Sequence, residues 1–258
     1  MIAIRSESEI AILREANQLV AEVLVTLAGM AQPGITTGAL DDEAAKLIRA
    51  FGAKPSFLGY HGYPKNTCIS VDDQIIHGIP GKRKLKDGEI VSIDVGVKHR
   101  GYFGDAALTV ACGTIDSTRT KLMEATDLAL SRAIAAAKEG NHLVDISRAV
   151  QTTCEEAGFS VVRSFVGHGI GTAMHEEPQV PNFVMRDKGP LLRAGMVLAI
   201  EPMVNAGTQD VRVMKDGWTA VTADGKPSAH FEHSIVVREA GGEILSATPK
   251  LVWGRRKQ

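Results

Sequence analysis

The chain has 258 residues, 44% of them hydrophobic and 23% charged, with a formal net charge of −1 at pH 7. This composition is typical of a globular protein with a sizeable core, and the near-neutral charge argues against a nucleic-acid or membrane-surface partner. The three cysteines are widely spaced, which argues against a disulfide framework and fits a reducing compartment. No signal peptide or membrane span is predicted, so we expect a cytoplasmic protein.

Two helices are predicted at the start of the chain. Ser6 and Glu9 have the spacing of a capping box, and apolar residues follow at helical spacing as far as Leu27. A second helix is predicted over residues 40–50. The stretch 57–67 is rich in glycine and aromatic residues and is predicted to be a surface loop. Short strands are predicted over residues 68–71 and 75–79.

The central feature of the sequence is a predicted β-hairpin over residues 90–110. Two β-rich runs flank a turn at residues 98–101, and each run carries one carboxylate among residues that favour burial, Asp94 and Asp105. The two acids lie at similar distances from the turn, so they could face each other across the hairpin. Opposed buried carboxylates repel, and a divalent cation between them would remove this penalty. For this hairpin alone, a solvated turn carboxylate stays an open alternative.

The order of elements is predicted to repeat after residue 116. Helices are predicted over 119–138 and 144–156, followed by strands over 161–165, 196–204, 211–222 and 231–237. The run 211–222 is expected to break at Asp216–Gly217. Leu85–Asp94 aligns with Leu192–Glu201, and in both segments the acid lies six residues after a glycine. We therefore predict one domain, residues 1–258, with an internal repeat over about 6–112 and 116–238. The expected fold is α+β, with two pseudo-symmetric helix-helix-hairpin halves that form one curved antiparallel sheet with helices on its outer face.

Five side chains are candidate metal ligands, because each lies in a β run or at a glycine-rich strand end where an unpaired charge would be costly: Asp94, Asp105, His168, Glu201 and Glu232. One histidine and four carboxylates form a hard, oxygen-rich set that suits Co²⁺, Mn²⁺, Fe²⁺ or Zn²⁺. The repeat makes Asp94 and Glu201 symmetry mates, which suits a two-metal site. A lone histidine is more often satisfied by hydrogen bonds than by a metal, so the prediction depends on the whole set.

The motifs I-D-V-G, a downstream G-D, G-H-G-I-G, I-E-P-M and F-E-H-S, in this order and spacing, resemble those of type I methionine aminopeptidases. The likeness runs nearly end to end and implies the pita-bread fold and a site with two divalent metal ions. Nothing in the sequence demands more than a monomer, so a monomer is expected. The likeness also implies removal of the initiator methionine from nascent polypeptides when the second residue is small, by a metal-bridging water or hydroxide that attacks the scissile carbonyl. A docking contact with the ribosome would fit this role.

The resemblance also implies individual roles for the candidate ligands. Asp94 would be a bidentate ligand of one metal ion, and Asp105 and Glu232 would bridge both ions. His168 and Glu201 would complete the shell of the other ion, and Glu201 would also shuttle the proton of the bridging water. A monovalent cation near the backbone of Asp72, Gln74 and Ser228 is a further expectation.

Residues outside the metal shell also acquire roles from the resemblance. His77 would contact the substrate near the scissile peptide, and His175 would donate a hydrogen bond to the scissile carbonyl and its oxyanion. The methionine pocket would be lined by Tyr60, His61, Tyr63, Cys68 and Trp218. The plainer alternative is that the histidines bond to backbone, the aromatics pack, and Cys68 is inert. Met174 and Phe57 depart from the common bacterial pattern, which leaves the fine selectivity of the pocket open.

Two other functions fit parts of the sequence. One is an Xaa-Pro peptidase of the same fold. Such peptidases usually carry an extra N-terminal domain, and the sequence of the loop Tyr60–Pro64 argues against this alternative. The other is a non-catalytic pita-bread module that binds proteins or nucleic acid, although such modules typically lose their metal ligands.

Overall fold

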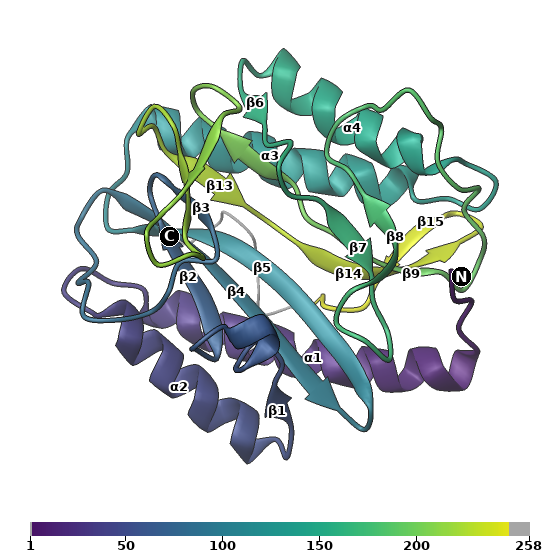
Figure 1. Ribbon diagram of the computed structural model, residues 1–258, viewed down its shortest axis with the longest axis horizontal. Coiled ribbons are helices and arrows are strands. Elements are labelled where there is room, and N and C mark those ends of the chain that lie inside the picture. The colour runs from purple at the N-terminus through teal and green to yellow at the C-terminus, as the bar shows by residue number, and fades with distance from the viewer. Residues whose placement is uncertain (1, 248–258) are drawn as a thin grey trace.

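The computed structural model describes residues 2–247, and its elements follow the predicted order (Figure 1). The first half consists of α1 (Glu7–Met30), α2 (Thr37–Ala50), β1 (Lys54–Pro55), the short 3-10 helix η1 (Tyr60–Gly62), β2 (Thr67–Val71), β3 (Gln74–Ile76), β4 (Glu89–His99) and β5 (Tyr102–Cys112). The second half consists of α3 (Ser117–Ala136), α4 (Leu143–Glu156), β6 (Ser160–Val161), β7 (Gly167–Gly169), β8 (Glu176–Val180), β9 (Val197–Ile200), β10 (Met203–Asn205), β11 (Val211–Val213), β12 (Ala220–Thr222), β13 (Ser228–His230), β14 (His233–Arg238) and β15 (Gly241–Ile244).

The helices begin where side chains cap them. The Ser6 hydroxyl accepts a hydrogen bond from the Glu9 N–H, and the Glu9 carboxylate accepts one from the Ser6 N–H at 2.9 Å, so the predicted capping box is confirmed. Helix α2 begins earlier than predicted, because Thr36 Oγ1 accepts from the Ala39 N–H at 3.1 Å and caps the helix. Helices α3 and α4 lie close to their predicted bounds.

The strands form antiparallel pairs in two main sheets. In one sheet β4 lies between β2 and β5, and in the other β9 lies between β7 and β14. The two halves therefore place corresponding strands in the same order, and the predicted α+β architecture with pseudo-symmetric halves is confirmed. Figure 1 shows α1 and α2 along one side of these strands and α3 and α4 along the other.

Hydrogen bonds link the two main sheets at one seam, so the curved sheet is not a single continuous ladder. The Glu232 N–H donates to the carbonyl of Ala107 at 2.8 Å, and the Ser234 hydroxyl donates to the carbonyl of Asp105 at 2.7 Å. Nearby, the Thr109 hydroxyl donates to the carbonyl of His230 at 2.8 Å. The seam thus joins β5 to the end of β13, the start of β14 and the segment between them.

Several predicted strands are shorter in the structure. The strand predicted over 196–204 divides into β9 and β10 at Glu201–Pro202, because proline has no N–H to continue a ladder. The strand predicted over 161–165 is only β6, because β10 pairs with Ser160 and Val161 alone. The strand predicted over 231–237 begins two residues late, since the Glu232 N–H bonds across the seam instead.

One apolar core contains buried side chains from both halves, among them Leu24, Val95, Leu130, Leu198 and Ile235. This packing fixes the two sheets against each other and makes the seam between them a rigid frame for polar side chains. Among the residues that the structure describes, no helix combines the length and the apolar character needed to cross a bilayer.

Candidate active site

The hairpin register places Asp94 and Asp105 on the same face, as diagonal neighbours. Strands β4 and β5 pair Asp94 with Ala107, and Asp105 with Gly96. Residues two apart on a strand share a face, so the two carboxylates are offset by two pairs instead of lying directly opposite each other. Both acids face the seam, and the charge of Asp94 contributes, after burial, to a raised pKa of Asp105.

The predicted ligands come together at the seam. Ligand atoms of Asp105, His168 and Glu232, all three buried, lie within 4.8 Å of one another. His168 Nε2 lies 3.6 Å from Glu201 Oε1 and 3.9 Å from Asp105 Oδ2. Asp94 interacts with the other three carboxyls, because its charge adds to the effect of burial in raising their pKa values. The five residues come from β4, β5, β7, the end of β9 and the segment before β14.

Negative charge in this cluster is not balanced by the residues around it. Burial raises the pKa of Asp94 to about 8, and it raises the pKa values of the other three carboxyls well above their usual range. Three oxygens have no hydrogen-bond partner among the described residues: Asp94 Oδ1, Asp105 Oδ1 and Glu232 Oε1. Burying carboxylates without partners is costly unless a cation binds them.

The tautomer of His168 supports the same conclusion. Its Nδ1 lies 2.9 Å from the carbonyl oxygen of Gly169, which can only accept, so Nδ1 carries the proton. Burial lowers the pKa of His168 to about 3, so the ring is neutral and Nε2 presents a lone pair. This lone pair and the carboxylate oxygens of Glu201 and Asp105 are all acceptors that converge on one region. Such a donor set fits a hard divalent metal ion, with the backbone carbonyl orienting the histidine.

His175 lies at the opening of this cluster. It is exposed, and its ring centroid is 4.2 Å from that of His168 in an edge-on arrangement. Its Nδ1 lies 2.7 Å from the hydroxyl oxygen of Tyr60. Partial desolvation, and secondly His61, lower the pKa of His175, so the ring is neutral near pH 7. A neutral imidazole beside a metal-ligand cluster can donate one hydrogen bond to a bound carbonyl.

The other predicted pocket residues lie in an aromatic group. The Tyr63 and Trp218 ring centroids are 5.1 Å apart, and His77 lies 6.2 Å from Trp218 and 5.6 Å from Phe165, all edge to face. Burial, and secondly His175, lower the pKa of His77 to about 4. The Tyr63 hydroxyl is occupied, because it donates to the backbone carbonyls of Thr67 and Gly78. Tyr63 and Trp218 thus offer apolar edges beside His77.

Native cysteines are expected to resist thiol reagents. Cys68 is 4% exposed, and Cys112 and Cys154 are fully buried. Burial raises the pKa of the Cys68 thiol well above its usual range and that of Cys154 to about 12, so little thiolate forms at pH 8. A chromogenic disulfide reagent should therefore detect three thiols after unfolding in guanidinium and almost none before it. Rapid reaction of Cys68 in the native protein, with protection by methionine, would contradict the expectation and show that the pocket wall is open.

Sequence reasoning missed two residues near Glu201. His230 is 2% exposed, and its Nε2, which has no hydrogen-bond partner in the described part of the chain, lies 3.9 Å from Glu201 Oε2. It stands two residues before Glu232, so strand alternation could have identified it as a side chain on the same face. Asn182 donates from Nδ2 to the carbonyl of Glu201 at 3.0 Å. No local pattern around Asn182 signals this contact.

The residues predicted to surround a monovalent cation, Asp72 and Gln74 of the first half and Ser228 of the second, lie close together. The Ser228 N–H donates to the carbonyl of Asp72 at 2.8 Å, and Gln74 Oε1 accepts from the Val71 N–H. The Asp72 carboxylate pairs with Arg119 at 3.0 Å and is therefore turned toward helix α3. The cation itself stays a prediction.

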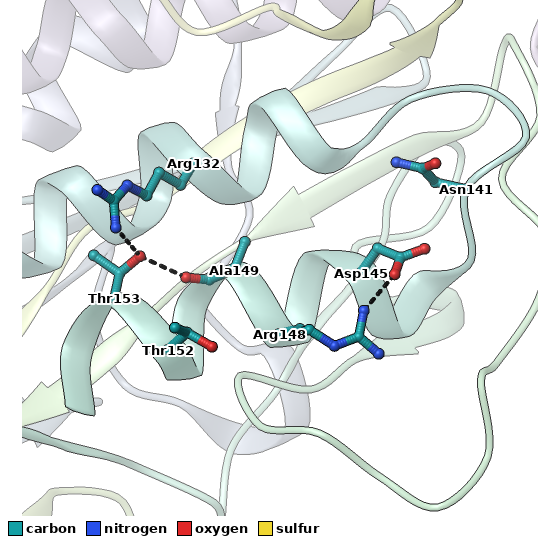
Figure 2. Close-up of a pocket in the computed structure, with 7 residues that line it drawn as sticks. All are labelled: Arg132, Asn141, Asp145, Arg148, Ala149, Thr152 and Thr153. Carbon is teal, nitrogen blue, oxygen red and sulfur yellow. Dashed lines mark hydrogen bonds and ion pairs between the residues drawn. The ribbon is translucent and has the colours of Figure 1, made fainter. Parts of the chain in front are cut away.

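A separate groove of about 500 Å³ lies on the helical face between α3 and α4 (Figure 2). Its polar side chains bond to one another: Arg132 donates to the Thr153 hydroxyl at 3.1 Å, and Arg148 pairs with Asp145 at 2.5 Å. None of the predicted site residues lines it, and it contains no group that the chemistry above needs.

Comparison with known proteins identifies the family. The profile of metallopeptidase family M24 matches residues 11–239. Methionine aminopeptidase 1 of Bacillus subtilis is 48% identical over 246 residues, covering 95% of this chain and 99% of that protein, and a methionine aminopeptidase of Clostridium perfringens is 50% identical at the same coverage. The crystal structure of a methionine aminopeptidase from Thermotoga maritima superposes with a TM-score of 0.94, at 43% identity, over 96% of this chain and 100% of that one.

Proline-specific peptidases share only the fold. The prolidase of Pyrococcus horikoshii superposes with a TM-score of 0.75 at 21% identity, and this chain covers 63% of its length. The Xaa-Pro alternative is therefore not favoured. The sequence motifs, the seam of acids and the end-to-end relatives lead to one conclusion: the chain belongs to metallopeptidase family M24 and, within it, to the type I methionine aminopeptidases.

Proposed function

We propose that this chain is a methionyl aminopeptidase that hydrolyses the first peptide bond of nascent polypeptides when methionine is followed by a small residue. The observation that supports it most directly is the cluster of acids and one neutral histidine at the seam, where a bound cation would satisfy the unpartnered carboxylate oxygens. The proposed ligands of two divalent metal ions are Asp94, Asp105, His168, Glu201 and Glu232. Co²⁺, Mn²⁺, Fe²⁺ and Zn²⁺ all suit this donor set.

When bound there, divalent ions would lower the pKa of a water molecule and stabilise the oxyanion that forms on the scissile carbonyl. The protein's own groups would manage the protons. Burial favours the protonated form of the Glu201 carboxyl, so this group is suited to take a proton from the attacking water and deliver it to the leaving amine. Asn182 holds the backbone of Glu201 in place.

Substrate positioning falls to residues from both halves. His175, neutral and open to solvent beside His168, would donate a hydrogen bond to the scissile carbonyl oxygen. His77 would contact the substrate near the scissile amide. Tyr63, Trp218 and the Cys68 sulfur are apolar or polarisable groups, which suits the thioether of a methionine side chain.

Peptide hydrolysis tests the proposal directly. Metal-stripped protein would be assayed with Met-Ala-Ser, Met-Lys-Ser and Ala-Pro-Ser, with and without added Co²⁺ or Mn²⁺. Metal-dependent release of methionine from Met-Ala-Ser alone is expected. Cleavage of Ala-Pro-Ser alone would transfer the chain to the proline-specific branch of the fold. Absence of any cleavage while metal binds would favour the non-catalytic binding module.

Stability of the metal-free protein is expected to fall as the pH rises from about 7 to 8. The folded state raises the pKa values of four carboxyls, Asp94 to about 8, so these groups hold protons that the unfolded chain has already released. Each carboxyl that stays protonated costs about 1.4 kcal/mol of stability per pH unit. The buried histidines oppose this trend only at lower pH, because their lowered pKa values make them neutral in both states above about pH 7.

Urea unfolding of the metal-free and Co²⁺-loaded proteins at the two pH values measures this effect. Bound cations should abolish the decline, because they stabilise the ionised carboxylates. Asp94→Asn should reduce the slope in the metal-free protein. A metal-free protein whose stability does not change over the same range would show that the acids are ionised without a cation, because neither state would then hold extra protons.

A cytoplasmic location, a monomeric state and contact with the ribosome are part of the same proposal, because the substrate is a newly made chain. They stay predictions from the sequence, as does the monovalent cation.

A further inference from the structure

A hydrogen bond joins the two halves of the molecule directly at His175. The Tyr60 hydroxyl oxygen lies 2.7 Å from His175 Nδ1, although the two residues are 115 positions apart. Their ring centroids are 5.2 Å apart, and the His175 ring also lies beside that of His168, at 4.2 Å between centroids. The His175 imidazole is thus held between a phenol hydroxyl and a candidate metal ligand.

The backbone around Tyr60 is fixed in an unusual conformation. Gly59, His61 and Gly62 all have positive φ, at 83°, 48° and 88°. Positive φ costs a non-glycine residue such as His61 free energy that the surrounding contacts must offset. The Gly59 N–H donates to the carbonyl of Tyr63 at 2.8 Å, and the Tyr63 N–H donates to that of Tyr60 at 2.9 Å. This tight turn determines where the half-buried Tyr60 side chain lies.

The loop that carries His175 is anchored from its other side. The carboxylate of Glu176, the next residue, accepts hydrogen bonds from the N–H groups of Thr172 and Ala173 at 2.8 and 3.0 Å. It also pairs with Arg5 at 2.5 Å, and both of these side chains are mostly buried. The Tyr60 side chain and the loop that carries His175 are therefore both fixed in position. Their contact is thus a built-in part of the site.

The tautomer follows from the chemistry of the two groups. A neutral imidazole carries one proton, and a phenol hydroxyl is a better donor than an imidazole N–H, while the unprotonated ring nitrogen is the better acceptor. If the hydroxyl donates to Nδ1, the proton of His175 must be on Nε2. His168 has the opposite arrangement, because the Gly169 carbonyl keeps its proton on Nδ1. The two neighbouring rings would thus serve opposite tasks. His168 would offer the lone pair of Nε2 to a metal ion, and His175 would offer its Nε2–H group to a carbonyl oxygen.

We infer that Tyr60 is a positioning residue that donates its hydroxyl proton to His175 Nδ1 and holds His175 in the Nε2–H tautomer. This goes beyond a place in the wall of the methionine pocket, for which the aromatic ring alone would suffice. The catalytic consequence rests on the proposed function, whereas the tautomer itself does not.

Nitrogen NMR of the full-length protein tests the tautomer without any assay. Two-bond ¹H–¹⁵N spectra of the metal-free and zinc-loaded protein near pH 7.5 distinguish protonated from unprotonated ring nitrogens, and His175→Gln assigns the His175 signals among the eight histidines. We expect an unprotonated Nδ1 in the native protein. Tyr60→Phe, which keeps the ring, should shift both nitrogens toward the average of two exchanging tautomers. A proton on Nδ1 in the native protein, or a spectrum that Tyr60→Phe leaves unchanged, would overturn the inference.

Tyr63→Phe is the matched control, because it removes a hydroxyl from the same region that bonds to the backbone carbonyls of Thr67 and Gly78 and not to His175. It should leave the His175 nitrogen signals where they are. Equal shifts in both variants would mean a general loosening of the loop, and the specific role of Tyr60 would be rejected.

Kinetics supply a second test. With Met-Ala-Ser, Tyr60→Phe should lower kcat about three- to tenfold with little change in KM, the effect of losing one hydrogen bond that orients a donor. The effect should disappear in a His175→Ala background, because the hydroxyl would then have no ring to orient. Additive losses would overturn the inference. If even the parent protein cleaves no peptide, the proposed function is wrong. The NMR spectra would still determine the tautomer of His175.

Discussion

Glu201→Gln is expected to lower kcat for Met-Ala-Ser about 10³-fold, with the fold intact. The amide has nearly the same shape but cannot take up a proton, and general acid–base catalysis contributes roughly 10²- to 10⁴-fold. The proposed role is consistent with the position of Glu201 in the cluster, where Oε1 lies 3.6 Å from His168 Nε2 and Oε2 lies 3.9 Å from His230 Nε2. Steady-state kinetics on metal-reconstituted protein would measure the loss.

Metal content must be measured on the same samples, because Glu201 is also a proposed ligand. A variant that still binds Co²⁺ but does not turn over would separate proton transfer from metal binding. Asp127→Asn is the matched control, since burial raises the pKa of this half-buried acid in helix α3 but nothing places it at the seam. It should retain full activity. If Glu201→Gln stays within about tenfold of the parent protein, Glu201 has no part in the proton transfer.

Local patterns predicted most of the fold, because the signals that define helices and hairpins lie within a few residues of each other. The capping box at Ser6 is one example. The hairpin turn was less well predicted: it consists of two residues, Arg100 and Gly101, both with positive φ, as in a type I′ turn. An arginine rarely adopts this conformation, so composition indicated a longer turn, and the offset between Asp94 and Asp105 could not be derived from it.

The candidate site was predictable where a charged side chain lies in an otherwise apolar strand. Asp105 and Glu232 stand among apolar strand residues, and the repeat links Asp94 to Glu201. Asn182 gave no such signal, because its significance depends on a contact between distant segments. Strand alternation places His230 on the same face as Glu232, but its contact with Glu201 could not be derived from the sequence. The types of ligand atom restrict the class of metal ion, but they do not distinguish among several divalent ions. Selectivity among these ions depends on geometry and availability as well as on affinity.

His175→Ala is expected to lower kcat about 10²-fold or more while KM changes much less. Removing one donor to a developing oxyanion typically costs 10²- to 10³-fold, and it affects the transition state more than the bound substrate. His175 meets the structural requirement, because it is exposed and neutral and its ring lies 4.2 Å from that of His168. Metal content should stay unchanged, in contrast to His168→Ala, because His175 is not a proposed ligand.

His99→Ala is a suitable control for this measurement. His99 lies at the end of β4 and contacts Glu15 at 3.4 Å, so its loss removes one weak surface pair and should not change kcat. A change confined to KM in His175→Ala would show that this histidine binds substrate without stabilising the oxyanion. Loss of metal together with activity would instead make His175 part of the metal shell, and the donor to the oxyanion would then have to be sought in His77, the other histidine whose pKa is lowered beside the aromatic group.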